Sequence, residues 1–144
     1  MLRTLKKFGF SSKELSTVYK GYVRPILEYA DVVWHSGITK KQSKEIEHVK
    51  KRVCRIIQGN NYTSYSESLV ACELDSLADR RREHCVNFAQ DLVHNIRTES
   101  IMPPTRQMSH GRTLRNSHHF SSLPARTSRF YNSPVPFFIR ILNN

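Results

Sequence analysis

The stretch TKKQSKEIEHVKKRVCRIIQGN, residues 39–60, constrains the fold most, because it carries the start, stop and spacing signals of an amphipathic helix. Thr39 and Gln42 match a capping box, and Gly59 is a typical residue just past a helix end. Apolar side chains recur at helical spacing, with Lys and Arg between them. We predict a cationic face opposite an apolar stripe made of Ile46, Val49, Val53, Ile56 and Ile57.

Upstream of this helix, residues 11–33 also show a helical pattern. Ser11 and Glu14 fit a second capping box, and apolar residues follow at helical spacing. Pro25 lacks a backbone donor and disfavours helical geometry at Arg24. We therefore expect a kink or break at Pro25, followed by a second helical piece that ends near Val33.

Two more helices are expected downstream. Residues 66–72 follow a loop and have the composition of a short helix. Ser76 and Asp79 match the cap of a longer helix, in which Arg80, Arg81 and Arg82 occupy the first half. The predicted buried face of the longer helix consists of Leu77, Cys85, Phe88, Leu92 and Ile96.

The periodic pattern ends near Arg97. Residues 98–144 hold all but one of the 6 Pro residues and are rich in Ser, Arg and His, while VPFFIRILNN at the end favours a short helix or strand. We predict a mostly α fold, in which a small bundle of four to five helices forms a domain over residues 1–97. An irregular, extended, basic Arg/Ser/Pro-rich arm over residues 98–144 follows it.

The charge is strongly positive and uneven. The chain has 23 Lys and Arg against 12 Asp and Glu, a net charge of +11 and a pI of about 10.0. Residues 1–60 carry 13 of the basic side chains and 5 acids, residues 61–100 carry 4 and 7, and residues 101–144 carry 6 Arg and no acid. Basic ends around an acidic middle favour a polyanionic partner, most often nucleic acid.

The sequence lacks the motifs of the common enzyme classes. It has no G-x-S-x-G elbow and no phosphate-binding glycine loop, and its acids are never adjacent as a two-metal site would favour. His118–His119 and the Glu83–Cys85 stretch lack companion ligands, so we expect no metal site, no cofactor and no small-molecule substrate. We expect no catalytic residues.

The cysteine spacing and the hydropathy indicate the cellular compartment. Cys54, Cys72 and Cys85 are an odd number at wide spacing, which favours a reduced intracellular protein, cytoplasmic or nuclear, with each thiol in the core. No stretch approaches the ~20 apolar residues of a membrane span, so we expect no membrane association.

Several motifs together resemble one protein family. LKKFGFSSKELSTVYKGYVRPILEYADVVWHSGITKKQSKEIEHVKKRVCRIIQG, then YTSYSESLVACELDSLADRRREHCVNFAQDLVHN, then RTSRFYNSPVPFFIRILNN resemble, in this order, the region that follows the polymerase core in reverse transcriptases of non-LTR (LINE- or jockey-like) retrotransposons. The resemblance covers nearly the whole chain. The polymerase and endonuclease catalytic residues of such elements are absent from it.

The resemblance implies a thumb-like region that grips the template–primer through phosphate contacts, with RNA or an RNA–DNA duplex as a non-specific partner and the reverse transcriptase core as a possible second one. Two alternatives stay open: a protein-interaction module that docks on a polymerase core or an acidic partner, and an inert retroelement relic. The candidate nucleic-acid-binding residues are Lys40, Lys41, Lys44, Lys50, Lys51, Arg52 and Arg55 on the helix and Arg112, Arg115, Arg126 and Arg129 in the arm.

The stretch KGYVRPILEYADVVWHSG contains aromatic residues that admit two interpretations. Tyr22, Tyr29 and Trp34 have the chemistry to stack on bases, but their helical spacing favours a packing role in the core. The four-residue spacing of Arg24 and Glu28 predicts a surface ion pair that contributes little to stability. We interpret the stretch as a packing hinge between two helices.

Overall fold

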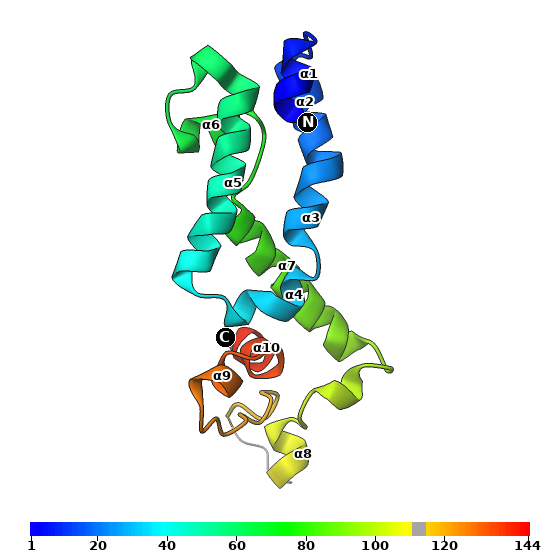
Figure 1. Cartoon of the computed structure of the whole chain (residues 1–144). Coiled ribbons are helices and arrows are strands. Elements are labelled where there is room, and N and C mark those ends of the chain that lie inside the picture. The colour runs from blue at the N-terminus through cyan, green and yellow to red at the C-terminus, as the bar shows by residue number, and fades with distance from the viewer. Residues whose placement is uncertain (111–114) are drawn as a thin grey trace. The chain divides into compact units, whose positions relative to one another are not determined.

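A computed structural model describes residues 1–110 and 115–144, which are mostly helical, as the sequence predicts (Figure 1). An isolated antiparallel bridge joins Thr105 and Phe120. The α-helices are α1 (Leu2–Lys7), α2 (Ser12–Val18), α3 (Arg24–Glu28), α4 (Asp31–Trp34), α5 (Lys40–Gln58), α6 (Tyr65–Ala71), α7 (Leu77–His94), α8 (Arg106–His110), α9 (Ser128–Tyr131) and α10 (Pro134–Leu142).

The chain divides into two compact units, each built from two stretches of sequence. The first unit contains residues 1–29 and 39–80, and the second contains residues 30–38 and 81–144. This division differs from the predicted boundary at residue 97. The reason is that packing joins residues far apart in sequence, which a composition shift along the chain cannot reveal.

The first unit has a core in which α2, α5 and α6 meet. Leu15, Tyr19, Cys54 and Ile57 are almost fully buried there. The predicted capping boxes of α2 and α5 are both present, and in α5 the Thr39 amide donates to Gln42 Oε1 at 2.9 Å. The local sequence signals therefore place these helix starts correctly.

The helix around Pro25 continues where the sequence predicted a kink or break. A π-helical turn, Tyr19–Val23, precedes Pro25, and α3 begins at Arg24. The π turn widens the backbone, which gives room to a proline ring that would clash with the carbonyl of a regular α-helix. The break lies instead at Ala30, whose φ of 50° is left-handed.

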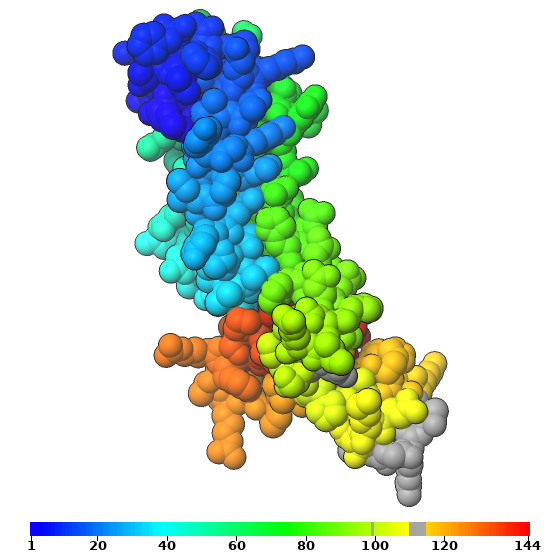
Figure 2. All heavy atoms as spheres, turned by 90° about the vertical axis from the view of Figure 1, so that its right-hand side faces the viewer, coloured from blue at the N-terminus to red at the C-terminus, as the bar shows by residue number. Residues whose placement is uncertain are grey.

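The exposed side of the α2–α3 segment contradicts the prediction that Tyr22 and Tyr29 pack in the core. Tyr22 is 70 % exposed, Ile26 77 % and Tyr29 80 %, so neither tyrosine packs in a core. In Figure 2 the blue side chains of this segment project from the surface of the first unit. The π turn contributes to this result, because it rotates the residues that follow it away from the positions that regular helical spacing assigns.

A lysine from α1 closes the C-terminal end of α5. Lys6 Nζ donates to the Ile57 carbonyl at 3.1 Å and also to the Ile56 carbonyl. A cation near the last carbonyls of a helix is favourable, because these groups lack intrahelical partners and carry the negative end of the helix dipole. Gly59 has a φ of 60°, and a Cβ there would lie 2.5 Å from Lys6 Nζ.

We expect Gly59→Ala to lower the free energy of unfolding by about 1–2 kcal/mol, because it strains the backbone and pushes Lys6 off the carbonyls. Gly21→Ala is the matched control. Gly21 is helical, and a Cβ there meets nothing within 4 Å. It should raise stability by about 0.5–1 kcal/mol. Urea denaturation followed by circular dichroism measures both, and equal effects at the two glycines would contradict the expectation.

The second unit gives part of the predicted arm a packed structure. α10 is a helix, which decides between the helix and the strand expected at this end. Phe138 and Ile139 of α10 pack with Cys85, Ala89 and Leu92 of α7. The short terminal helix expected in the arm therefore forms at residues 134–142, and it is packed, because its apolar face meets a partner face on α7.

The predicted buried face of α7 is right in its middle and wrong at its end. Leu77, Cys85 and Leu92 are buried, whereas Phe88 is partly exposed and Ile96 fully so. α7 ends at His94 because a turn follows, in which the Thr98 amide donates to the Asn95 carbonyl at 2.9 Å. Ile96 is thus outside the helix whose spacing suggested its burial.

Within residues 1–110 and 115–144, none of the helices combines the length and the apolar character needed to cross a membrane.

Candidate nucleic-acid interface

The cations of α5 form a row along one face of the helix. Lys40, Lys44, Lys51 and Arg55 recur at spacings of four or seven residues, so they share one side of the helix. Lys41 and Arg52 flank them, and all of these except the half-buried Lys51 are exposed. The capping box at Thr39 fixes where the helix begins and hence which residues share this face.

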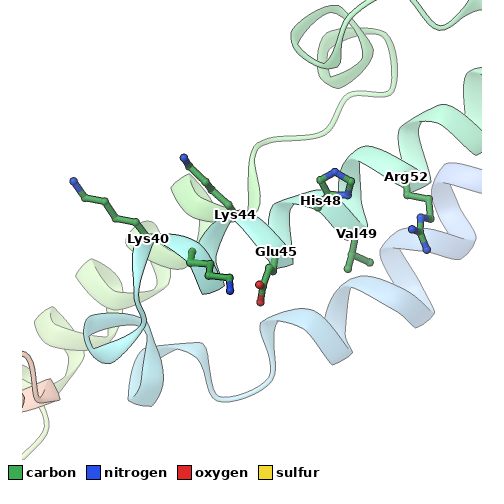
Figure 3. A pocket seen from close by; sticks show the side chains of 7 residues that line it. Lys40, Lys44, Glu45, His48, Val49 and Arg52 are labelled. Atoms are coloured by element: carbon green, nitrogen blue, oxygen red, sulfur yellow. The ribbon is translucent and has the colours of Figure 1, made fainter.

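An open groove runs beside this row. It has a volume of about 620 Å³. Figure 3 shows Lys40 and Lys44 reaching outward while Glu45 and Val49 point toward the neighbouring blue ribbon. Glu45 is the one acid among the described residues that line it, which are Lys40, Lys41, Lys44, Glu45, His48, Val49 and Arg52. The groove therefore has a positive character along its length.

The α1 helix extends the cationic surface, which the sequence prediction missed. A second depression of about 440 Å³ contains Arg3, Lys6 and Lys7 of α1 together with Arg52 and Arg55 of α5. Arg52 lines both depressions, so the two adjoin at this side chain. The available signal was the absence of acids before Glu14, next to four basic residues.

Lys50 is the one helix residue that the structure removes from the predicted surface. It is completely buried, and no hydrogen-bond partner lies near its Nζ. Burial lowers the pKa of Lys50, and the nearby Glu47 opposes that shift. Lys50 stands four residues before Cys54 and seven before Ile57, which places it on the buried face with them. It cannot contact a phosphate in this fold.

The arm contributes less to a defined surface. Arg112 lies outside the described residues. Arg115, Arg126 and Arg129 belong to the second unit and are exposed.

Trp34 is also in the second unit, half-buried, with the Arg81 guanidinium carbon 5.6 Å from the centre of its ring. It thus fits the predicted packing role better than Tyr22 and Tyr29 do.

The titratable groups offer little for covalent or metal chemistry. Burial raises the pKa of the Cys54 and Cys85 thiols to about 11 each, and also raises the pKa of Cys72. Thiols of this kind stay protonated at neutral pH and are poor nucleophiles. In the part of the chain that the structure describes, no three His, Cys, Asp or Glu side chains gather closely enough to hold a metal ion.

Comparison of the chain with protein-family models, with curated proteins and with solved structures gave no match. The resemblance to retrotransposon reverse transcriptases therefore stays a prediction from the quoted motifs. The surface of the first unit is the remaining basis for inferring a function.

Proposed function

We propose that this chain is a non-catalytic nucleic-acid-binding module, the C-terminal part of a retrotransposon-type RNA-directed DNA polymerase. One observation carries the proposal: a cation stands on nearly every turn of the exposed face of α5, and the surface continues onto α1. The motif resemblance supports the same assignment. The first unit binds the nucleic acid, and the chemistry of polymerisation belongs to another part of such an element.

The spacing of the row suits a chain of phosphates. Lys40 and Lys44 lie one turn apart on α5, which is ~5.4 Å along the helix axis, and Lys44 and Lys51 lie two turns apart, which is ~10 Å. Lys and Arg in such a row neutralise phosphates and release counterions, and they read no base sequence. Glu45 opposes binding at one point of the groove, but the four Lys and Arg side chains that line the groove outweigh it. Binding should therefore be non-specific in sequence and sensitive to salt.

The test is fluorescence anisotropy of a labelled RNA–DNA hybrid, titrated with the full chain over a salt series. We expect log Kd to rise steeply with log salt, by about 0.7–0.9 for each phosphate contacted. The pair Lys44→Glu and Arg52→Glu should weaken binding by about 100-fold at moderate salt and flatten the slope by about 2, because two attractive contacts become repulsive.

The matched control is the pair Lys13→Glu and Lys20→Glu, which changes the net charge equally. Both of its residues line a different depression, between α2 and the end of α6. If both pairs weaken binding equally, only net charge acts and no defined surface exists. Absence of binding at low salt by a folded chain would contradict the proposal and leave the docking module or the relic.

A further inference from the structure

The second unit contains a depression with a volume of about 580 Å³. Its lining includes residues of α7, of α10 and of a 3₁₀ turn (His35–Gly37), together with Ser122. All of these residues belong to the second unit. The volume falls within the ~300–1,000 Å³ of pockets that hold small organic molecules, so the depression is large enough for a ligand.

Two arginines give the depression a positive charge. Arg82 of α7 and Arg140 of α10 both line it, and no Asp or Glu is among the described lining residues. Arg82 is exposed, and no carboxylate of a described side chain lies within ion-pair distance of either guanidinium. Asp31, the acid that acts on His35, is buried and lies 2.7 Å from the His84 ring. Both arginine charges are therefore available to an anion that enters the depression.

Arg140 is held in place by its neighbours. Its Nη1 donates to the Tyr131 carbonyl at 2.7 Å, and its guanidinium carbon lies 3.9 Å from the centre of the Tyr131 ring. A guanidinium has several N–H donors, so most of them remain for water or a ligand. A side chain that is already ordered loses little conformational entropy when a ligand binds, which favours affinity.

The depression also has apolar walls. Phe137 and Ile141 of α10 line it and remain partly exposed, although they pack against the core of the second unit. The His35 ring meets the Phe137 ring edge to face, with the ring centres 5.8 Å apart. Burial lowers the pKa of His35 below its ordinary 6.5, so this ring is neutral at pH 7. Aromatic and aliphatic walls of this kind favour a ligand with an apolar or aromatic body.

We propose that this depression binds a small aromatic oxyanion, whose ring lies against Phe137 and whose phosphate or carboxylate is held by Arg82 and Arg140. Arginine pairs with either anion through two parallel hydrogen bonds, which also orient the ligand. A simple anion would leave the apolar walls uncovered, and a neutral ring would leave both guanidinium groups without a counter-charge. The site belongs to the second unit and is independent of nucleic-acid binding by the first.

The test is titration of the full chain with naphthyl phosphate by isothermal titration calorimetry. For a ligand of about 15 non-hydrogen atoms we expect a Kd of about 0.1–1 mM. Inorganic phosphate and naphthalenemethanol, which each carry one part of this ligand, should bind at least about tenfold more weakly. A comparison with naphthoate shows which anion is preferred, and binding of either supports the proposal. Amide NMR spectra should show ligand-dependent shifts at Arg82, Ser122 and Arg140.

Arg82→Gln should weaken the binding of naphthyl phosphate by about tenfold, because it removes one charged partner of the anion. Arg82 is exposed, so the substitution should leave the fold intact, which circular dichroism checks. Arg97→Gln is the matched control. Arg97 is exposed in the same unit and outside the depression, so its loss should change the affinity by less than about twofold.

Equal affinities for naphthyl phosphate and inorganic phosphate would overturn the proposal, as would equal affinities for naphthyl phosphate and the neutral alcohol. Equal effects of the two arginine substitutions would place the ligand elsewhere and also overturn it. So would absence of binding to a folded chain. The nucleic-acid proposal is tested separately, because Lys44→Glu with Arg52→Glu should leave the affinity for naphthyl phosphate unchanged.

Discussion

Lys50→Glu is expected to lower the free energy of unfolding by about 3–5 kcal/mol and so to unfold the first unit at 37 °C. In the sequence this substitution looks like a harmless charge reversal on a basic face. In the structure Lys50 is completely buried near Glu47, and Glu47 already has one carboxylate oxygen buried without a hydrogen-bond partner. A second buried carboxylate there would have no cation to offset it.

Urea denaturation followed by circular dichroism measures this loss, and amide hydrogen exchange of α5 peptides locates it in the first unit. Lys51→Glu, one residue along the half-buried edge of the cationic face, is the control and should cost less than about 1 kcal/mol. A folded Lys50→Glu chain with native exchange rates in α5 would show that Lys50 is not buried as described.

Lys50→Met tests the burial of Lys50 by removing its charge, and here we expect a gain in stability instead of a loss. It keeps the volume and removes the charge, so stability should rise by about 1 kcal/mol or more near neutral pH. Burial lowers the pKa of Lys50 below 10.5, so the unfolded chain binds more protons than the folded one just below that pH. The advantage of the Met variant should therefore shrink as pH rises toward 10.5, which denaturation at several pH values measures.

Glu28→Ala is expected to lower the free energy of unfolding by about 2–4 kcal/mol. The Glu28 side chain is only 10 % exposed and Arg80 only 20 %, and the Arg80 guanidinium binds both carboxylate oxygens, at 2.6 and 3.2 Å. This bidentate pair joins α3 to the start of α7 within the first unit. Removing the carboxylate takes from Arg80 its partner for two charge-assisted hydrogen bonds.

Arg24→Ala is the control. Arg24 lies one turn before Glu28 in the same helix and contacts the same carboxylate more weakly, at 3.7 Å. Its loss should cost less than about 0.5 kcal/mol. Thermal or urea denaturation gives both values. Similar losses for the two variants would mean that Glu28 serves chiefly as a partner for Arg24, as the sequence spacing alone suggests.

Several elements follow from the sequence alone because local chemistry decides them. The capping boxes at Ser11 and Thr39 and the Ser76–Asp79 cap all form as predicted. The helix start at Thr39 and its end at Gly59 match the expected positions. These signals involve atoms three or four residues apart, so they do not depend on where the rest of the chain lies.

The candidate interface was predicted in part. The exposed cations of α5 follow from its helical period, and the burial of Lys50 follows from the same period once Cys54 and Ile57 are taken as the centre of the buried face. The prediction failed at Lys50 because lysine is rarely buried, a general preference that outweighed the spacing. The addition of Arg3 and Lys7 needed the docking of α1 on α5, which no local pattern shows.

The sequence by itself determined that the chain is mostly helical, where its capped helices begin, and that its charge is positive at both ends. Only the tertiary structure decided that Tyr22 and Tyr29 are exposed, that Glu28 binds Arg80 and that α10 packs on α7. Caps and periodicity act within one or two helical turns. Exposure and partners depend on which apolar faces meet, a competition among distant segments that the free energy of the whole unit settles.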